Sequence, residues 1–240
     1  SIKLPAKIKD YEEDTEFKVE TLDNLTSLVS IAVEKADDAY FSAIDGMLCN
    51  DKGNTIIYCP TAYSTASGNV EIPAGVSVIG PGVFRGRNNF TEISIPGYVT
   101  EIGEFAFADC KNIAKVTIEG ARSKDLVIKD SAFSGCARIK DVVFAGNGKT
   151  TVDSGKTTIG PNAFANLLQL RTFTVEAGAN ISEIGVSAFE GDSKLRTIDI
   201  ADGAVVTKIG DSAFRGCENI LSFTIPATTA AVGNNAFENC

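Results

Sequence analysis

The stretch that decides the fold is Ile-Gly-Asp-Ser-Ala-Phe-Arg-Gly-Cys-Glu-Asn-Ile-Leu-Ser-Phe-Thr-Ile-Pro, residues 209–226. Its Ile-Gly pair ends a short extended segment, because glycine permits a sharp turn. Asp211 or Ser212 then suits the cap of a short helix. The last five residues alternate apolar and polar side chains until the proline, which is the period of a half-buried strand. The side chains predicted to be buried are Ala213, Phe214, Cys217, Ile220, Phe223 and Ile225.

This phrase recurs along the chain at irregular intervals. Forms of Ile-Gly-x-x-Ala-Phe occur six times, and an apolar β-type residue follows each Phe by nine positions. A seventh phrase runs from Val232 to Phe237, and the steps between successive Phe residues are 23, 26, 31, 25, 25 and 23. The six Phe residues are Phe84, Phe107, Phe133, Phe164, Phe189 and Phe214, and their partners are Ile93, Val116, Val142, Phe173, Ile198 and Phe223.

The distance from each Phe to its partner is constant, whereas the step from one Phe to the next varies. This combination indicates one rigid repeated unit, whose copies differ in length only between the partner residue and the next Phe. Such a unit cannot bury its apolar side alone, so stacked neighbours must bury it for one another. We therefore predict an α/β repeat solenoid, in which short helices or turns alternate with strands of a parallel sheet.

In this register the residues resemble the BspA-type leucine-rich repeat of bacterial surface proteins. The phrase I-G-x-x-A-F-x-x-C-x-x-L-x-x-I-x-I-P is matched nearly throughout by residues 102–118, although residues 128–133 have lost the Gly and Leu167 replaces the Cys. Residues 44–60 resemble the hairpin insertion of that family. The resemblance covers about residues 20–240 and implies a right-handed leucine-rich-repeat coil with its sheet on the concave face.

The same register reaches the N-terminal end. Leu22, Leu25, Leu28, Ile31 and Val33 keep the nine-residue offset, so a degenerate first repeat begins near residue 17. We expect residues 1–16 to form a linker or a ragged cap, and 17–240 to form the solenoid, with an irregular hairpin segment at 37–69. In that segment, 46–50 should pair with 57–59 across the turn at 51–53.

Composition excludes several functions. The net charge of −9 argues against nucleic acid and anionic membrane surfaces, which attract basic proteins. No apolar run approaches the ~20 residues of a membrane helix. The chain has no histidine, which removes Ser-His and Cys-His nucleophile pairs and most zinc sites. We expect no enzyme activity, no cofactor and no bound metal.

Four of the six cysteines follow a motif Phe by three residues, namely Cys110, Cys136, Cys217 and Cys240. Leu occupies this position in other copies, which favours a small buried thiol. Disulfides between adjacent coils, Cys110–Cys136 and Cys217–Cys240, are the alternative, because coil spacing of about 5 Å permits them. The remaining pair, Cys49 and Cys59, lies on the two hairpin strands.

Two surfaces are candidates for binding. The first is a row of outward residues along the sheet, Ser94, Thr117, Thr174, Asp199 and Thr224, interrupted by Val143. Thr is also an ordinary solvent-facing strand residue, so this row needs no function. The second is a group of tyrosines, a residue type favoured in interfaces. Tyr58 should face outward, between the inward residues Ile57 and Cys59, although packing of the hairpin also explains the group. Its members are Tyr40, Tyr58, Tyr63 and Tyr98.

The resemblance implies an extracellular or cell-surface protein that contacts host or neighbouring-cell macromolecules as an adhesin or scaffold. A glycan-binding module of a surface polysaccharide system is the alternative. A protein ligand is the expected partner, with glycan as the second possibility. The sequence begins at Ser1 rather than Met, in keeping with a signal peptide removed or outside it.

Overall fold

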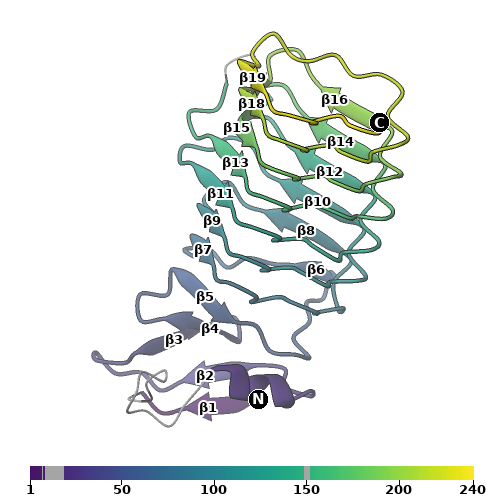
Figure 1. Cartoon of the computed structure of the whole chain (residues 1–240). Helices are drawn as coiled ribbons and strands as arrows, with labels where there is room; N and C mark the ends of the chain where they lie inside the picture. The colour runs from purple at the N-terminus through teal and green to yellow at the C-terminus, as the bar shows by residue number, and fades with distance from the viewer. Residues whose placement is uncertain (7, 9–18, 149–151) are drawn as a thin grey trace.

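The computed structural model describes residues 1–6, 8, 19–148 and 152–240, and all structural statements refer to these. The expected boundary between residues 16 and 17 lies outside them. The secondary structure consists of strands and one 3-10 helix, η1 (Val19–Asn24), which follow one another up a stack of coils (Figure 1). The strands are β1 (Ile2–Leu4), β2 (Ile31–Val33), β3 (Phe41–Ile44), β4 (Met47–Asn50), β5 (Thr55–Tyr58), β6 (Asn69–Val70), β7 (Val78–Ile79), β8 (Glu92–Ile95), β9 (Glu101–Ile102), β10 (Lys115–Ile118), β11 (Leu126–Ile128), β12 (Asp141–Phe144), β13 (Thr157–Ile159), β14 (Thr172–Val175), β15 (Asn180–Ile184), β16 (Thr197–Ile200), β17 (Val205–Val206), β18 (Lys208–Ile209) and β19 (Ala231–Val232).

Two sheets form two walls of the solenoid. The first is a six-stranded parallel sheet in the order β16-β14-β12-β10-β8-β6. Its register places Val70, Ile93, Val116, Val142, Phe173 and Ile198 side by side, as the nine-residue offset predicts. The second sheet has eleven strands, ordered β19-β18-β15-β13-β11-β9-β7-β5-β4-β3, with β17 attached to β15. The prediction of stacked parallel strands is therefore confirmed, and a second sheet is added.

The predicted short helices do not form, so the α/β description was wrong and the turn alternative holds. Within each coil, the residues two before and two after the motif Phe have positive φ, such as Ser212 (55°) and Gly216 (74°) around Phe214. A right-handed helix cannot contain such residues. The segment around each motif Phe is a chain of turns instead.

These turns form a third wall that also pairs from coil to coil. Around Phe107, the N–H groups of Phe105, Phe107 and Asp109 donate to the next coil at 3.2, 2.8 and 2.8 Å. The N–H groups between them, on Ala106 and Ala108, donate locally to carbonyls three residues back. We call this segment of each coil the turn wall. Because its donors alternate, it links coils much as a parallel strand does.

The motif phenylalanines stack into one continuous column inside the turn wall. Successive ring centroids from Phe84 to Phe237 are 4.9, 5.1, 4.8, 5.3, 5.2 and 5.3 Å apart. The rings are parallel within 9°. All but Phe237 are fully buried. The column thus occupies the middle of the apolar interior that all coils share.

The motif glycine is required by the distance between coils. A Cβ added at Gly185 would lie 2.5 Å from the Ile159 carbonyl oxygen, and one at Gly103 would lie 2.6 Å from the Pro81 nitrogen. A side chain at either position would fit only if the two neighbouring coils moved apart. Gly therefore recurs because of stacking rather than because of the turn alone.

The N-terminal end departs from the repeat. Strands β3, β4 and β5 form an antiparallel meander, and β5 continues the eleven-stranded sheet by pairing in parallel with β7. The predicted hairpin is therefore confirmed and belongs to the sheet of the solenoid. Beneath it, β1 pairs in parallel with β2 (Figure 1). These strands and η1 enclose a separate apolar cluster that contains Leu22, Leu28 and Ile31, whereas Leu25 is exposed.

Because the rings form a column, the stability lost on removing one ring should depend on its place in the column. Phe133→Ala should lower the free energy of unfolding by roughly 3–5 kcal/mol, the usual cost of removing a buried aromatic ring. Phe237→Ala should cost clearly less, because this ring is partly exposed and has a column neighbour on one side only. Chemical denaturation followed by circular dichroism measures both, and equal losses would contradict the stacked column.

Candidate functional site

The predicted row of outward side chains forms one continuous line on the six-stranded sheet. Ser94, Thr117, Val143, Thr174 and Asp199 are consecutive partners on β8, β10, β12, β14 and β16. Their side chains are partly or fully exposed, and on β8, β10, β12 and β14 they alternate with buried residues. Thr224 follows at the same offset and is exposed, but it lies outside the described strands. We refer to these residues as the threonine row.

The tyrosines do not form one exposed patch. Tyr58 is 5% exposed and packs in the N-terminal apolar cluster, so the prediction that it faces outward was wrong. Tyr63 is buried in the main core against Phe90, with ring centroids 6.2 Å apart. Tyr40 and Tyr98 are about half exposed, and the Tyr98 hydroxyl donates to the Ile72 carbonyl at 2.8 Å.

The reason for the error at Tyr58 is that the N-terminal apolar cluster covers the side of β5 that faces away from the main core. The register of β4 with β5 shifts between Leu48 and Cys49, so that Leu48 pairs with Tyr58 but Cys49 with Ile56. A shift of one residue moves side chains to the other face of a strand. With this shift, Ile56 lies in the main core together with Cys59, whereas Tyr58 and the partly covered Ile57 pack in the N-terminal cluster.

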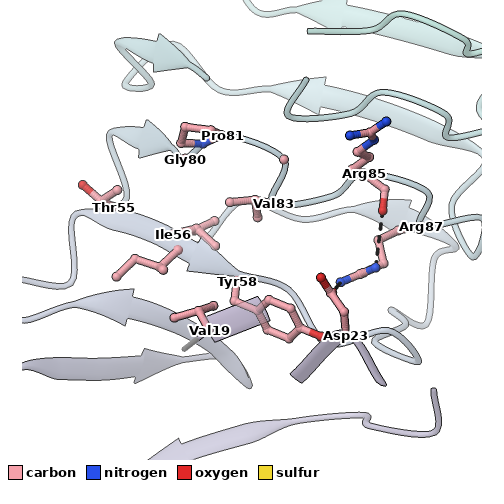
Figure 2. Close-up of a pocket in the computed structure, with 12 residues that line it drawn as sticks. Val19, Asp23, Thr55, Ile56, Tyr58, Gly80, Pro81, Val83, Arg85 and Arg87 are labelled. Carbon is pink, nitrogen blue, oxygen red and sulfur yellow. Dashed lines mark hydrogen bonds and ion pairs between the residues drawn. The ribbon is translucent and has the colours of Figure 1, made fainter. Parts of the chain in front are cut away.

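Two hollows lie at the irregular N-terminal end. One, of about 500 Å³, is lined by residues between Val33 and Asp51. The other is a groove of about 590 Å³ between β5, the first turn wall, and Val19 and Asp23 of η1. Figure 2 shows Ile56 and Tyr58 on one side of this groove and Pro81 and Val83 on the other.

Arg87 closes one end of the groove. Its Nε and Nη2 donate to the Cys59 carbonyl at 3.1 and 2.8 Å, and Nη2 lies 3.2 Å from the Asp23 carboxylate (Figure 2). The guanidinium also stands over the Tyr58 ring, 5.4 Å from its centroid. Burial raises the pKa of Tyr58 to about 12, so its hydroxyl stays neutral. Arg87 thus ties the N-terminal cluster to the first coil.

The cysteines have a structural role. All six are free, and none forms the disulfides considered as the alternative. The thiols of Cys110, Cys136, Cys217 and Cys240 donate to the carbonyl of the motif Phe one coil earlier, at 2.9, 3.0, 3.2 and 3.3 Å. Burial raises the pKa of Cys49 to about 11 and that of Cys59 to about 12, which disfavours the reactive thiolate. We call the residues three after each motif Phe the thiol ladder.

Asp192 occupies one position of the thiol ladder and is fully buried. Its Oδ1 accepts the Leu167 N–H at 2.6 Å, whereas Oδ2 has no hydrogen-bond partner in the described structure. Burial raises the pKa of this carboxyl well above 3.8, despite the Leu167 N–H. In the coils that carry Cys at this position, the thiol donates to the carbonyl of the motif Phe one coil earlier. The only signal of this residue in the sequence is its position, three residues after Phe189, where other coils have Cys.

The described part of the chain contains no group of three or more His, Cys, Asp and Glu side chains suited to a metal ion. Among the same residues there is no helix long and apolar enough to cross a membrane.

Comparison with known proteins identifies the family. Residues 55–155 and 148–240 match the BspA type leucine rich repeat region, in six copies. This chain therefore belongs to the BspA-type leucine-rich repeat family. A search of curated protein sequences gives no match.

Solved structures share the fold at low identity. A leucine-rich repeat protein from T. pallidum is 22% identical with a TM-score of 0.58, over 80% of this chain and 84% of that one. The pneumococcal vaccine antigen PcpA is 18% identical with a TM-score of 0.56, over 97% of this chain and 50% of that one. A leucine-rich repeat protein from Eubacterium ventriosum is 18% identical with a TM-score of 0.56, over 99% and 57%. The chain thus spans about half the length of the latter two proteins.

Asp192 generates a pH prediction. The unfolded carboxyl ionises near pH 3.8, while the folded carboxyl keeps its proton to a higher pH. Its contribution to stability is therefore complete at low pH and falls as the pH rises through the folded pKa. An amide in place of this carboxyl preserves its shape and offers an N–H donor at every pH. Asp192→Asn should therefore match the wild type near pH 4 and be more stable at pH 7.

Denaturation midpoints at both pH values measure this effect. Asp199→Asn removes one exposed carboxylate and controls for the change in net charge. A difference between Asp192→Asn and wild type that does not vary with pH would show that Asp192 is not buried as a neutral acid.

Proposed function

We propose that this protein is a non-catalytic interaction protein of the cell surface or extracellular space, an adhesin or scaffold that contacts macromolecules of a host or a neighbouring cell. The threonine row carries this proposal. It aligns outward side chains of successive coils along one sheet, at the regular spacing that strand pairing imposes. An extended sheet of this kind offers a large contact area without a pocket.

The family supports the surface location and the binding role. Proteins of similar structure include a vaccine antigen of pneumococcus and a leucine rich cell surface protein from Faecalibacterium prausnitzii, which is 24% identical over 83% of this chain with a TM-score of 0.51. These descriptions apply to those proteins, and their extension to this chain is part of the proposal.

The side chains available support binding rather than catalysis. The chain has no histidine to act as a general base. Its buried thiols donate hydrogen bonds to backbone carbonyls and so hold neighbouring coils together. The threonine hydroxyls of the row lie on the face of a sheet, and a hydroxyl alone is a weak nucleophile.

A glycan-binding module is the second candidate, and Tyr98 is the observation that favours it. Its ring is 43% exposed, and its hydroxyl is held by the Ile72 carbonyl. A fixed, exposed aromatic ring is a suitable surface against which the apolar face of a sugar can pack.

Substitution of the row tests the main proposal. Thr117→Arg/Thr174→Arg places two long charged side chains on β10 and β14 and should weaken cell-surface binding by roughly tenfold or more, since unmatched groups are costly in an interface. Val127→Arg/Ser182→Arg, on β11 and β15 of the other sheet, adds the same two charges, is the matched control and should bind normally. Labelled protein titrated onto intact cells provides the measurement. Equal binding by the row variant would place the binding face elsewhere.

A glycan array separates the two candidates. If the glycan proposal holds, wild-type protein binds a defined set of sugars and Tyr98→Ala loses them, while Tyr63→Phe retains them as a buried control. Absence of binding by wild-type protein, together with saturable binding to a surface protein, would leave the protein-ligand proposal alone.

A further inference from the structure

The groove beside β5 differs from the rest of the solenoid in its backbone hydrogen bonds. In each later coil, carbonyls of the turn wall accept N–H groups from the coil before. For example, Ser187, Phe189 and Gly191 donate to the carbonyls of Asp211, Ala213 and Arg215 at 2.9, 2.8 and 2.8 Å. The equivalent carbonyls of the first coil belong to Pro81, Val83 and Arg85, by their offsets from Phe84.

No described residue supplies these donors to the first coil. The carbonyls of Pro81 and Val83 accept no hydrogen bond within the described structure, and that of Arg85 receives only the Arg87 Nη1 at 3.3 Å. Both Pro81 and Val83 line the groove (Figure 2). The groove therefore presents alternate backbone acceptors, which is the edge pattern that an extended chain satisfies.

The course of β5 explains why this edge stays open. Strand β5 pairs with β7 up to the bond from the Gly80 N–H to the Ile56 carbonyl, at 3.0 Å. The bulge at the next residues bends β5 toward β4. The gap that results has a volume of about 590 Å³, within the range of ligand sites in proteins.

Charge indicates what kind of segment fits. Arg215 holds the same place in its coil as Arg85, one residue after the motif Phe. Arg215 lies between two carboxylates, Glu190 of the coil before at 3.7 Å and Glu238 of the coil after at 2.9 Å. Arg85 pairs with a carboxylate of the coil after, Asp109 at 3.4 Å, and the Arg85 side chain is 60% exposed. Within the described residues Arg85 has no carboxylate partner on its earlier side, and it lines the groove there.

We propose that this groove binds an extended peptide of a partner protein, which donates alternate N–H groups to the Pro81 and Val83 carbonyls and a carboxylate to Arg85. The peptide completes the first turn wall as a preceding coil would. This is β-augmentation in form: main-chain bonds give affinity, and one acidic side chain gives specificity. The site is separate from the threonine row, so either proposal can fail without the other.

The solenoid itself supplies the probe. The acetylated and amidated peptide Gly-Val-Ser-Ala-Phe-Glu-Gly-Asp has the sequence of residues 185–192, which donate in this way to the coil of Arg215. Fluorescein-labelled peptide should show saturable binding to the 240-residue chain by fluorescence polarisation. Methylation of the Phe nitrogen of the peptide removes one donor and should abolish binding.

Matched protein variants locate the site. Arg85→Glu should weaken binding about tenfold or more, because like charges oppose each other in an interface. Replacing the peptide Glu by Lys should restore binding to Arg85→Glu. Arg215→Glu is the control in the same register and should leave peptide affinity unchanged. Ile57→Trp, at the partly covered wall of the groove, should block the peptide, with thermal melting to confirm that the variant is folded.

Three results would overturn the proposal. One is no saturable binding up to about 1 mM protein. Another is equal binding of the N-methylated peptide, which would mean that the backbone donors are not used. The third is an equal loss in Arg85→Glu and Arg215→Glu, which would assign the effect to overall charge or to the other end of the solenoid, including association of two copies of the chain.

Discussion

The structure depends on one constraint, which is that every wall of the coil must advance by the same distance per repeat. Paired strands lie about 4.8 Å apart, and the phenylalanine rings stack at 4.8 to 5.3 Å. The turn wall meets the same spacing through its alternate N–H donors. The residues from the motif Phe to its partner nine positions later connect two paired walls, so no residue can be inserted there without breaking both.

This constraint separates architecture from function. The motif Ile, Gly, Ala and Phe residues and the thiol ladder are committed to contacts between coils, and most of them are buried. The side chains free to meet a partner lie on the outer faces of the two sheets and at the N-terminal end, where the repeat breaks. The two proposed interaction surfaces occupy these two kinds of place. At Asp192 a buried acid takes the place of a hydrogen-bonded thiol, and one of its oxygens accepts the Leu167 N–H.

Much of the fold could be predicted from the sequence, because the nine-residue offset sets the strand register directly. The hairpin was also predictable from its alternation and its turn residues. The turn wall was not, because its left-handed positions are held by Ser, Asn and even Phe105 as well as Gly. Single residues with positive φ leave no signature when Ser and Asn also suit helix caps. The second sheet was missed since its strands, such as β7 and β9, are only two residues long.

The candidate sites divide in the same way. The threonine row followed from strand alternation, and the structure aligns all its strand members. Tyr58 did not follow, because the repeat pattern does not show that the N-terminal cluster covers the outer side of β5. The groove beside Pro81 and Val83 could not be predicted from side chains at all. It consists of backbone carbonyls whose donors are missing, and only the register of the neighbouring coils reveals them.

The central claim is that one coil, from Phe to Phe, is the unit of the structure. The most direct test is to delete residues 165–189, which removes one full period of 25 residues and brings Phe164 into the place of Phe189. The account predicts a folded, shorter solenoid with the same circular dichroism per residue and a lower denaturation midpoint. Deletion of residues 165–176 removes about half a coil and should abolish folding. The strands of one coil would then lie beside the turn wall of the next coil, and neither could form its hydrogen bonds. Unfolding of the full-period deletion, or proper folding of the half-period deletion, would contradict the account.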